Sequence, residues 1–549
     1  VFDMNIHIKS YLLGLAFCGV ALTSCESFDS INLNPNDPTP ETVDPTFLLT
    51  PTMIKGTLDV DMYQRIHNLY VDNFAQYFAN DKYASNNCVP VESWTQDFWN
   101  MHWQLIDALN EIIKNYSDDP KLVNTVQIAR IWKVWLFHRA TDLWGDIPYF
   151  KAADGSGLAA PYDPQKDIYY DMFKELAEAS AALDVQGATP GKGDLIFNGD
   201  ITRWKSFANS LRLRLAMRLT EVDPAKAKEE AEAAVTAGAL LASNNDNVKI
   251  WRCQSYIFDG RFYYANAHLF NGKRQTMSYS MEKLLTGLGG IPFPEGEGYT
   301  NVPACVDPRG PVYFNVTNEY NGATEDFRGR WKGVPSGLPV AERELPENSR
   351  TNNSRIGVYY VSDTKTPGVP FTIQFNRDQI LMYYAEICFL RAEGALRGWN
   401  MGGSAKEFYE EGIKASMAEA GIPDDTVDKY MKSTMPNAYG TTVPFENKGT
   451  SHDSQLEKII TQKYFANFPD NGWEAWNDYR RLNIPDLEPF VAPEPGYVVK
   501  AGERDWRGSV RRITYPAQEA IVNEDNYNAA VSRIGEDKTT TRMWWDAKQ

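Results

Sequence analysis

The sequence predicts a mainly α-helical protein whose helices pack as antiparallel pairs around one loop-rich lobe. Apolar residues recur at helical spacing along much of the chain, as at Trp204, Leu211 and Leu215, while the arginines of that segment largely take other faces. Short polar links join several neighbouring helical segments, which is typical of antiparallel helix pairs. From about 244 to 376 this periodicity disappears and Gly, Pro, Asn and Tyr dominate, so we expect an irregular lobe there.

An export signal precedes the helices. Residues 11–22 form a short apolar run behind a basic opening, and the run ends in the motif LTSC at 22–25. A run this short cannot cross about 30 Å of hydrocarbon as a helix, so residues 1–24 are predicted to be a secretory signal. The motif resembles the bacterial lipobox, and we expect Cys25 to be lipidated. The alternative is an ordinary signal peptide whose cysteine stands there by chance.

A lipid-anchored tether is predicted at 25–46, ahead of a single domain at 47–549. The tether is rich in Asn, Pro, Asp and Thr, and its NPNDP core at 34–38 cannot propagate a helix or a central strand. Acyl chains on Cys25 would hold the domain on a membrane surface. No later stretch reaches the length of about 18 apolar residues that a membrane span needs.

The helical segments can be placed in chain order from their apolar spacing. Asp223 and Pro224 open one of them, and Gly238 closes it. Within the lobe, 357–361 and 370–375 are predicted to be short strands. No regular repeat of about 34 residues is visible, so stacked helix pairs are inferred from arrangement alone. The predicted helices are 62–78, 94–115, 123–143, 168–183, 204–219, 225–237, 380–395, 405–420 and 456–464.

Composition favours a binding protein over an enzyme or a nucleic-acid partner. The net charge of −17 would repel nucleic acid. The chain has no GxSxG or HExxH motif, and its cysteines show no CxxC pair or zinc-like spacing, so no cofactor or metal site is predicted. A lipid-anchored glycoside hydrolase remains the less favoured alternative, because it needs only two carboxylates about 5 to 10 Å apart and nothing singles out a pair.

Five sequence blocks carry a resemblance to a known family. They are RIWKVWLFHRATDLWGDIPY at 130–149, WKSFANSLRLRLAMRL at 204–219, GWEAWNDYRR at 472–481, RRITYP at 511–516 and WWD at 544–546. In this order, and behind a lipobox, the blocks resemble the SusD/RagB family, in its SusD-like branch. The resemblance covers the chain from the tether to its last residues.

The resemblance implies a nutrient-binding outer-membrane lipoprotein. Its fold would be a superhelical scaffold of tetratricopeptide-like helix pairs that cradles a loop-rich lobe with a few short strands. Members cap a SusC-like TonB-dependent transporter and deliver oligosaccharides, or peptides in some members. Glu26 and Asp29 resemble the acidic signal that sends such lipoproteins to the cell exterior. We therefore expect a lipid-anchored protein of the outer membrane that faces outward.

The family blocks are interpreted as scaffold. We expect Arg480 and Arg481 to pair with carboxylates such as Glu474 or Asp478, or with helix carbonyls. Glycine in the GDIP turn at 145–148 permits the turn after a helix, and proline prevents the helix from resuming. No ligand-binding residue follows from these blocks.

The candidate ligand site comes instead from aromatic residues outside the helical periodicity. Sugars offer C–H faces for stacking on Trp and Tyr, and their hydroxyls need polar side chains, but an extended peptide can use the same groups. The two places that combine both kinds of residue are 80–94 and the lobe, which also contains Trp251. The alternative is that these aromatics pack the lobe onto the helices. The preferred candidates are Tyr83, Trp94, Tyr320 and Trp331.

Overall fold

A computed structural model describes the chain over residues 43–79, 90–154, 159–252, 275–318, 323–338, 342, 345–361, 377–446, 451–490 and 510–547. The signal at 1–24, Cys25, Tyr83, Tyr320 and the predicted strand at 370–375 lie outside these ranges. The chain divides into a unit of residues 1–47 and a unit of residues 48–549. Apart from the start of the first helix, all elements below belong to the second unit.

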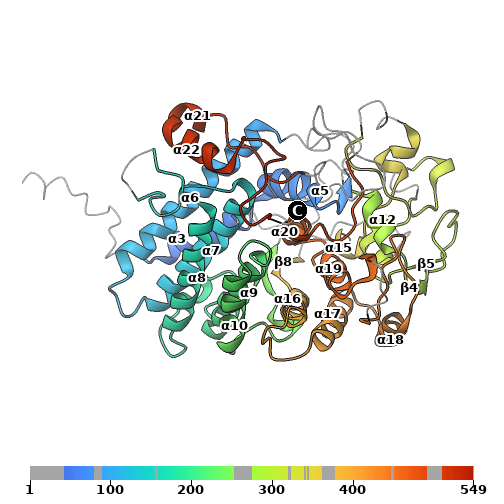
Figure 1. Cartoon of the computed structure of the whole chain (residues 1–549), viewed down its shortest axis with the longest axis horizontal. Helices are drawn as coiled ribbons and strands as arrows, with labels where there is room; N and C mark the ends of the chain where they lie inside the picture. The colour runs from blue at the N-terminus through green and yellow to red at the C-terminus, as the bar shows by residue number, and fades with distance from the viewer. Residues whose placement is uncertain are drawn as a thin grey trace, which may run out of the picture. The chain divides into compact units, whose positions relative to one another are not determined.

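Helices stack in sequence along the first half of this unit (Figure 1). Each of α6, α7, α8, α9 and α10 packs on the next, and α9 also contacts α16, which in turn packs on α17 and α19. This arrangement confirms the predicted mainly helical, tetratricopeptide-like class. The bounds are α3 Thr46–Gly56, α6 Glu92–Tyr116, α7 Val123–Trp144, α8 Gln165–Ala182, α9 Ile201–Arg218, α10 Pro224–Thr236, α16 Tyr384–Leu396, α17 Ala405–Glu419, α18 Asp424–Lys432, α19 Gln455–Ala466, α20 Gly472–Leu482, α21 Glu519–Val522 and α22 Glu524–Ile534.

Side-chain caps set several of these helix starts. The Asp200 carboxylate accepts the Thr202 and Arg203 N–H groups at 3.0 and 3.2 Å at the start of α9. Asp223 caps α10 ahead of Pro224, as predicted. Seven of the predicted helices, from 94–115 to 225–237 and at 405–420 and 456–464, agree with the observed bounds to within about three residues.

Two predicted helices need correction. The segment at 62–78 consists of α4 Val60–Met62, a π-helix η1 Tyr63–Val71 and α5 Asp72–Phe74. It stops before Gln76, whose backbone adopts a left-handed φ of 57°. The segment at 380–395 begins as a strand, because Ile380 pairs with Lys249 of a neighbouring strand, and the helix starts only at Tyr384.

The lobe contains short antiparallel sheets. Its four-stranded sheet has the order β1-β3-β7-β6, and two further pairs join β2 with β8 and β4 with β5. The strand bounds are β1 Phe78–Ala79, β2 Val248–Arg252, β3 Thr276–Met277, β4 Thr286–Pro292, β5 Cys305–Val306, β6 Phe314–Asn315, β7 Arg355–Ile356 and β8 Arg377–Met382. Three short helices accompany them: α12 Tyr279–Leu285, α13 Gly310–Tyr313 and α15 Val358–Val361. Single 3-10 turns elsewhere in the second unit are η3 Gly191–Gly193, η4 Asn244–Asp246, η7 Glu325–Phe327, η8 Pro346–Asn348, η9 Arg350–Asn352 and η10 Ser451–Asp453.

The predicted strand at 357–361 is instead the helical turn α15. Its β-branched and aromatic composition favours a strand. The preceding residues already form β7, and the Gly357 N–H donates to the Tyr313 carbonyl at 2.7 Å. The chain then closes one turn, in which Tyr360 N–H donates to the Gly357 carbonyl at 3.0 Å. A β-carbon on Gly357 would lie 1.9 Å from the Val312 carbonyl oxygen, so this close approach requires glycine.

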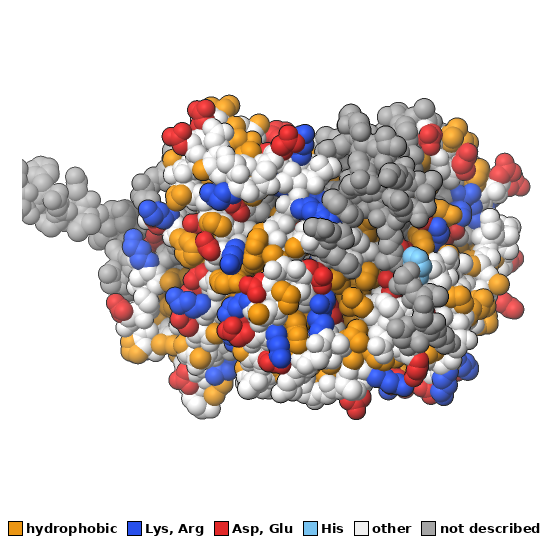
Figure 2. Space-filling model, in the orientation of Figure 1, with side chains coloured by type: hydrophobic (Ala, Val, Ile, Leu, Met, Phe, Trp, Pro, Cys, Tyr) orange, Lys and Arg blue, Asp and Glu red, His pale blue; other side chains and the backbone are white. Residues whose placement is uncertain are grey.

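Charges are mixed on the face of the molecule in Figure 2, where acidic and basic side chains alternate over the helices at the left. Within the described ranges, no helix is both long enough and apolar enough to span a membrane. The same ranges contain no cluster of three His, Cys, Asp or Glu side chains that could hold a metal ion.

Candidate ligand-binding site

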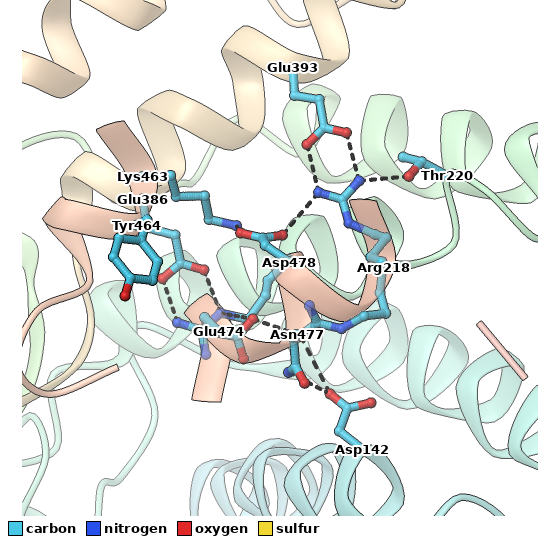
Figure 3. Close-up of polar contacts among 12 residues, drawn as sticks. Asp142, Arg218, Thr220, Glu386, Glu393, Lys463, Tyr464, Glu474, Asn477 and Asp478 are labelled. Atoms are coloured by element: carbon cyan, nitrogen blue, oxygen red, sulfur yellow. Dashed lines mark hydrogen bonds and ion pairs between the residues drawn. The ribbon is translucent and has the colours of Figure 1, made fainter. Parts of the chain in front are cut away.

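The GWEAWNDYRR segment forms α20, and its charged side chains are buried (Figure 3). Arg481 donates from Nη1 and Nη2 to the two carboxylate oxygens of Glu393 on α16, at 2.6 and 2.8 Å. The same Nη2 donates to Asp478 at 2.9 Å, and Lys463 on α19 pairs with Asp478 at 2.9 Å. These contacts tie α20 to α16 and α19.

The other end of this network joins α20 to α7 and α9. Arg218 Nη2 pairs with the Glu474 carboxylate at 2.6 Å. Arg480 donates to the main-chain carbonyls of Asp142 and Arg511 at 2.7 and 2.8 Å. The expected pairing of these arginines with carboxylates and helix carbonyls is therefore confirmed. Because buried charges are costly unless they are paired, we assign the network to the scaffold.

Ion pairing controls the protonation of the buried carboxylates. Burial opposes ionisation of Glu393, but the Arg481 guanidinium outweighs it and lowers the pKa of this carboxyl to about 2. Burial likewise opposes ionisation of Glu474, and Arg218 holds its pKa well below the ordinary range. Both carboxylates are therefore ionised at neutral pH, and neither resembles a general acid with a raised pKa.

The four-stranded sheet contains both the strand that precedes the Tyr83 segment and the strand that precedes the Tyr320 segment. Ala79 is the last described residue before the segment of Tyr83, and it pairs with Thr276. Thr276 pairs with Arg355, and Arg355 pairs with Asn315. One row across the sheet thus links the strand before the Tyr83 segment with the strand before the Tyr320 segment. Tyr83 and Tyr320 themselves lie outside the described residues.

Trp94 lies on the first turn of α6 and is partly buried. Its ring centroid is 5.8 Å from that of Tyr70. The Tyr70 hydroxyl accepts the Val91 N–H at 2.5 Å and donates to the Val91 carbonyl at 3.0 Å, which fixes the chain just before the helix. Burial raises the pKa of Tyr70 to about 12, so this hydroxyl stays protonated. Trp94 is therefore held in place at the start of α6, against Tyr70.

Trp331 is a core residue of the lobe. Its side chain is 2% exposed, its indole N–H donates to the Phe314 carbonyl at 3.1 Å, and its ring lies 5.7 Å from Phe293. A ring buried in this way presents no face to a ligand. The expectation that Trp331 stacks on ligand is therefore corrected in favour of packing, because Phe293 and the Phe314 main chain lie against its side chain.

Trp251 is an exposed aromatic residue of the lobe. It lies on β2 opposite Asp378 of β8 and is 50% exposed. The alternation along β2 predicts this outward direction, because its neighbours Ile250 and Arg252 are buried. The sequence alone groups Trp251 with the other lobe aromatics, and the alternation along β2 is the signal that separates it from them.

Two surface cavities lie away from these aromatic residues. One, of about 650 Å³, is bordered by η4, α16, α17 and α18. The other, of about 390 Å³, is bordered by α6, α7 and α8. Neither is lined by Trp94, Trp251 or Trp331.

Together, the stacked helix pairs, the buried charge network and the short antiparallel sheets define a helical-repeat scaffold. A family model described as SusD-like, SusD and RagB outer membrane lipoprotein, matches residues 48–546. The chain belongs to this family.

Solved structures of SusD homologues share the fold. A homologue from Parabacteroides distasonis is 31% identical with a TM-score of 0.82, and the match covers 92% of this chain and 98% of that one. A chitin-binding SusD homologue from Flavobacterium johnsoniae is 29% identical with a TM-score of 0.72, at the same coverage of 92% and 98%. A homologue from Bacteroides uniformis is 28% identical with a TM-score of 0.70, covering 92% and 99%. No curated protein matches the chain by sequence.

Proposed function

We propose that this protein is a surface-exposed outer-membrane lipoprotein that binds nutrient oligosaccharides and delivers them to a SusC-like TonB-dependent transporter. The family match over residues 48–546 carries the proposal. The Flavobacterium johnsoniae homologue, described as chitin-binding, supports a glycan as the cargo. Lipidation at Cys25 would supply the anchor, and the transporter would supply the passage through the membrane.

The ligand face is proposed to lie beside the four-stranded sheet. Trp94 on α6 and Trp251 on β2, in the separate β2–β8 pair, are two described aromatic residues next to segments that interrupt the helical pattern. Tyr83 and Tyr320 remain candidates because their segments follow strands that meet in one sheet row. Stacking on an aromatic ring and hydrogen bonding at its edge suit an oligosaccharide, whose rings have apolar C–H faces.

The ligand class can be tested by retention on insoluble polysaccharides. Purified protein without its signal and lipid is mixed with chitin, starch, xylan or cellulose, and the bound fraction and any released sugars are measured. We expect retention on at least one polysaccharide without release of product. Released sugar would favour a glycoside hydrolase. Retention on none of them, together with binding of peptides, would favour the peptide-binding alternative.

Delivery can be tested by extraction from the native membrane. A tag on this chain should co-purify a TonB-dependent barrel in mild detergent, because a binding protein without a membrane-spanning helix in its described ranges needs a partner to move cargo inward. Recovery of this chain alone across several mild detergents would contradict the transporter partnership while leaving glycan binding intact.

A further inference from the structure

A cavity of about 390 Å³ lies on the helical side of the molecule, between α6, α7 and α8. These helices are at the left in Figure 1, whereas the lobe elements α12, β4 and β5 are at the right. Its volume falls within the range of about 300 to 1000 Å³ that is typical of small-molecule sites. Buried Val126 and Val134 line it together with polar side chains, so it combines an apolar wall with hydrogen-bonding groups.

The polar groups of the cavity are held by fixed hydrogen bonds. Arg130 donates from Nε and Nη2 to both carboxylate oxygens of Glu175, at 2.8 and 3.0 Å. Lys133 Nζ donates to Asn110 Oδ1 at 2.7 Å, which uses one of the three donors of its ammonium group. The Tyr149 hydroxyl donates to Asp171 Oδ2 at 3.0 Å, which leaves acceptor capacity on the Asp171 carboxylate.

An aromatic ring stands at the edge of the cavity. Phe150 is 55% exposed, and its ring packs edge-on against Tyr149 at 5.0 Å. The N–H groups of Tyr149 and Phe150 both donate to Asp163 Oδ2, at 2.8 and 2.9 Å, so the turn that presents the ring is fixed. An exposed ring beside a cavity with fixed polar groups is typical of a ligand-binding site.

We propose that this cavity is a second site, which binds one neutral sugar residue by stacking on Phe150 and by hydrogen bonds to Lys133 and Asp171. The ligand class rests on the proposed function, but the site is separate from the face beside the sheet. Sugar hydroxyls both donate and accept, so one ring can satisfy the ammonium and the carboxylate together. Two basic and two acidic side chains line the cavity, namely Arg130, Lys133, Asp171 and Glu175, and this balance suits an uncharged ligand.

Burial disfavours the charged form of both groups that would meet the sugar. It lowers the pKa of the Lys133 ammonium, against the nearby Glu175 and Asp171 carboxylates, which raise it. It also raises the pKa of the Asp171 carboxyl. Since the environment of both groups disfavours additional charge, a neutral hydroxyl-bearing ligand fits the cavity better than an ion.

The site can be tested with saturation-transfer NMR on the full soluble domain. The probes are glucose, galactose, mannose, xylose and N-acetylglucosamine, with leucine as a zwitterionic competitor. The variants are Phe150→Ala and Asp171→Asn, and Met435→Ala serves as a control because it is an exposed apolar residue that does not line the cavity. We expect at least one sugar to bind about tenfold more weakly to each cavity variant and equally well to the control.

A crystal soaked with the binding sugar should show it against Phe150. Absence of monosaccharide binding, equal binding to the variants, or binding of leucine alone would overturn the proposal. Failure of this site is distinguishable from failure of the proposed function. If only the second site is wrong, the wild-type protein and the Phe150→Ala variant are retained equally on polysaccharide. If the proposed function is wrong, the wild-type protein itself binds no glycan.

Discussion

At the residue scale, buried charged side chains around α20 are held by oppositely charged or hydrogen-bonding partners. Arg481 is fully buried, and its guanidinium is held by Glu393, Asp478 and the Thr220 hydroxyl. Removing one member of such a cluster leaves a buried charge without compensation, which costs about 3 to 5 kcal/mol. These pairs therefore act as specific connections between α16, α20 and the residues that follow α9.

Glu393 gives this network a predicted pH dependence. Its folded pKa of about 2 is depressed from the ordinary value of 4.5, so its contribution is present above pH 4.5 and is lost as the pH falls toward 2. The shift corresponds to about 3 kcal/mol. In urea unfolding, Glu393→Gln should be destabilised at pH 7, and its difference from wild type should shrink between pH 4.5 and 2. An exposed control, Glu111→Gln, should show no such trend; a pH-independent difference for Glu393→Gln would refute this account.

Comparing alanine variants of Trp331 and Trp251 tests whether a buried tryptophan contributes more to the free energy of unfolding than an exposed one. Trp331→Ala removes a buried ring and should cost about 3 to 5 kcal/mol of unfolding free energy. Trp251→Ala removes a half-exposed ring and should change it by less than about 1 kcal/mol. Denaturant unfolding of both variants measures the contrast, and equal effects would mean that Trp331 is not the core residue described above.

Individual residue roles were the hardest part to predict from sequence. Trp94 stands at the start of the predicted helix 94–115 and Trp331 lies in the predicted irregular lobe; the first is partly buried on α6 and the second is enclosed by the lobe. Neighbours that bury Trp331, such as Phe293 and Phe314, become adjacent only in the folded lobe. Arg481 was easier, because Asp478, three residues earlier on the same helix, already supplies a carboxylate partner.

At the element scale, the predicted start of α17 coincides with a local capping signal. In α17, the Ser404 hydroxyl accepts the Glu407 N–H at 3.3 Å, and the Glu407 carboxylate accepts the Ser404 N–H at 2.9 Å. This capping box satisfies two donors that the helix start would otherwise leave open. Ser404→Ala should therefore destabilise the protein by about 1 kcal/mol.

Thermal unfolding can measure this effect. Ser404→Asp is the matched control, because its carboxylate keeps an acceptor for the Glu407 N–H, and it should stay within about 0.5 kcal/mol of wild type. An alanine variant as stable as the aspartate variant would show that the cap contributes nothing here.

The sheets were poorly predicted for a physical reason. Strands of two residues, such as β1, β3, β6 and β7, are too short to show an alternating pattern. Their pairing joins positions as distant as Ala79 and Thr276, which no local signal reveals. At 380–395 the apolar spacing fits a helix, but pairing with β2 keeps its first residues in a strand. Tertiary contacts outweigh local preference in these segments.

At the scale of the whole molecule, the order of helices and lobe followed from the sequence, whereas the anchor remains a prediction. The apolar run before Cys25 predicts lipidation, so Cys25→Ala should release the protein from the membrane fraction. Cys18→Ala is the matched control, because Cys18 lies within the apolar run, and this variant should stay membrane-bound. Fractionation of cells expressing each form measures the outcome, and full membrane association of Cys25→Ala would contradict the anchor.

We propose above all that this SusD-like protein binds a glycan through Trp94 and other aromatic residues next to segments that interrupt the helical pattern. The most direct measurement is calorimetric titration of wild type, Trp94→Ala and the control Met435→Ala with chito-, malto- and xylo-oligosaccharides and with peptides. We predict that one glycan series binds and that Trp94→Ala weakens it by about 1 to 3 kcal/mol, while the control binds like wild type. Binding of peptides but no glycan, or an unchanged affinity in a folded Trp94→Ala variant, would contradict the account.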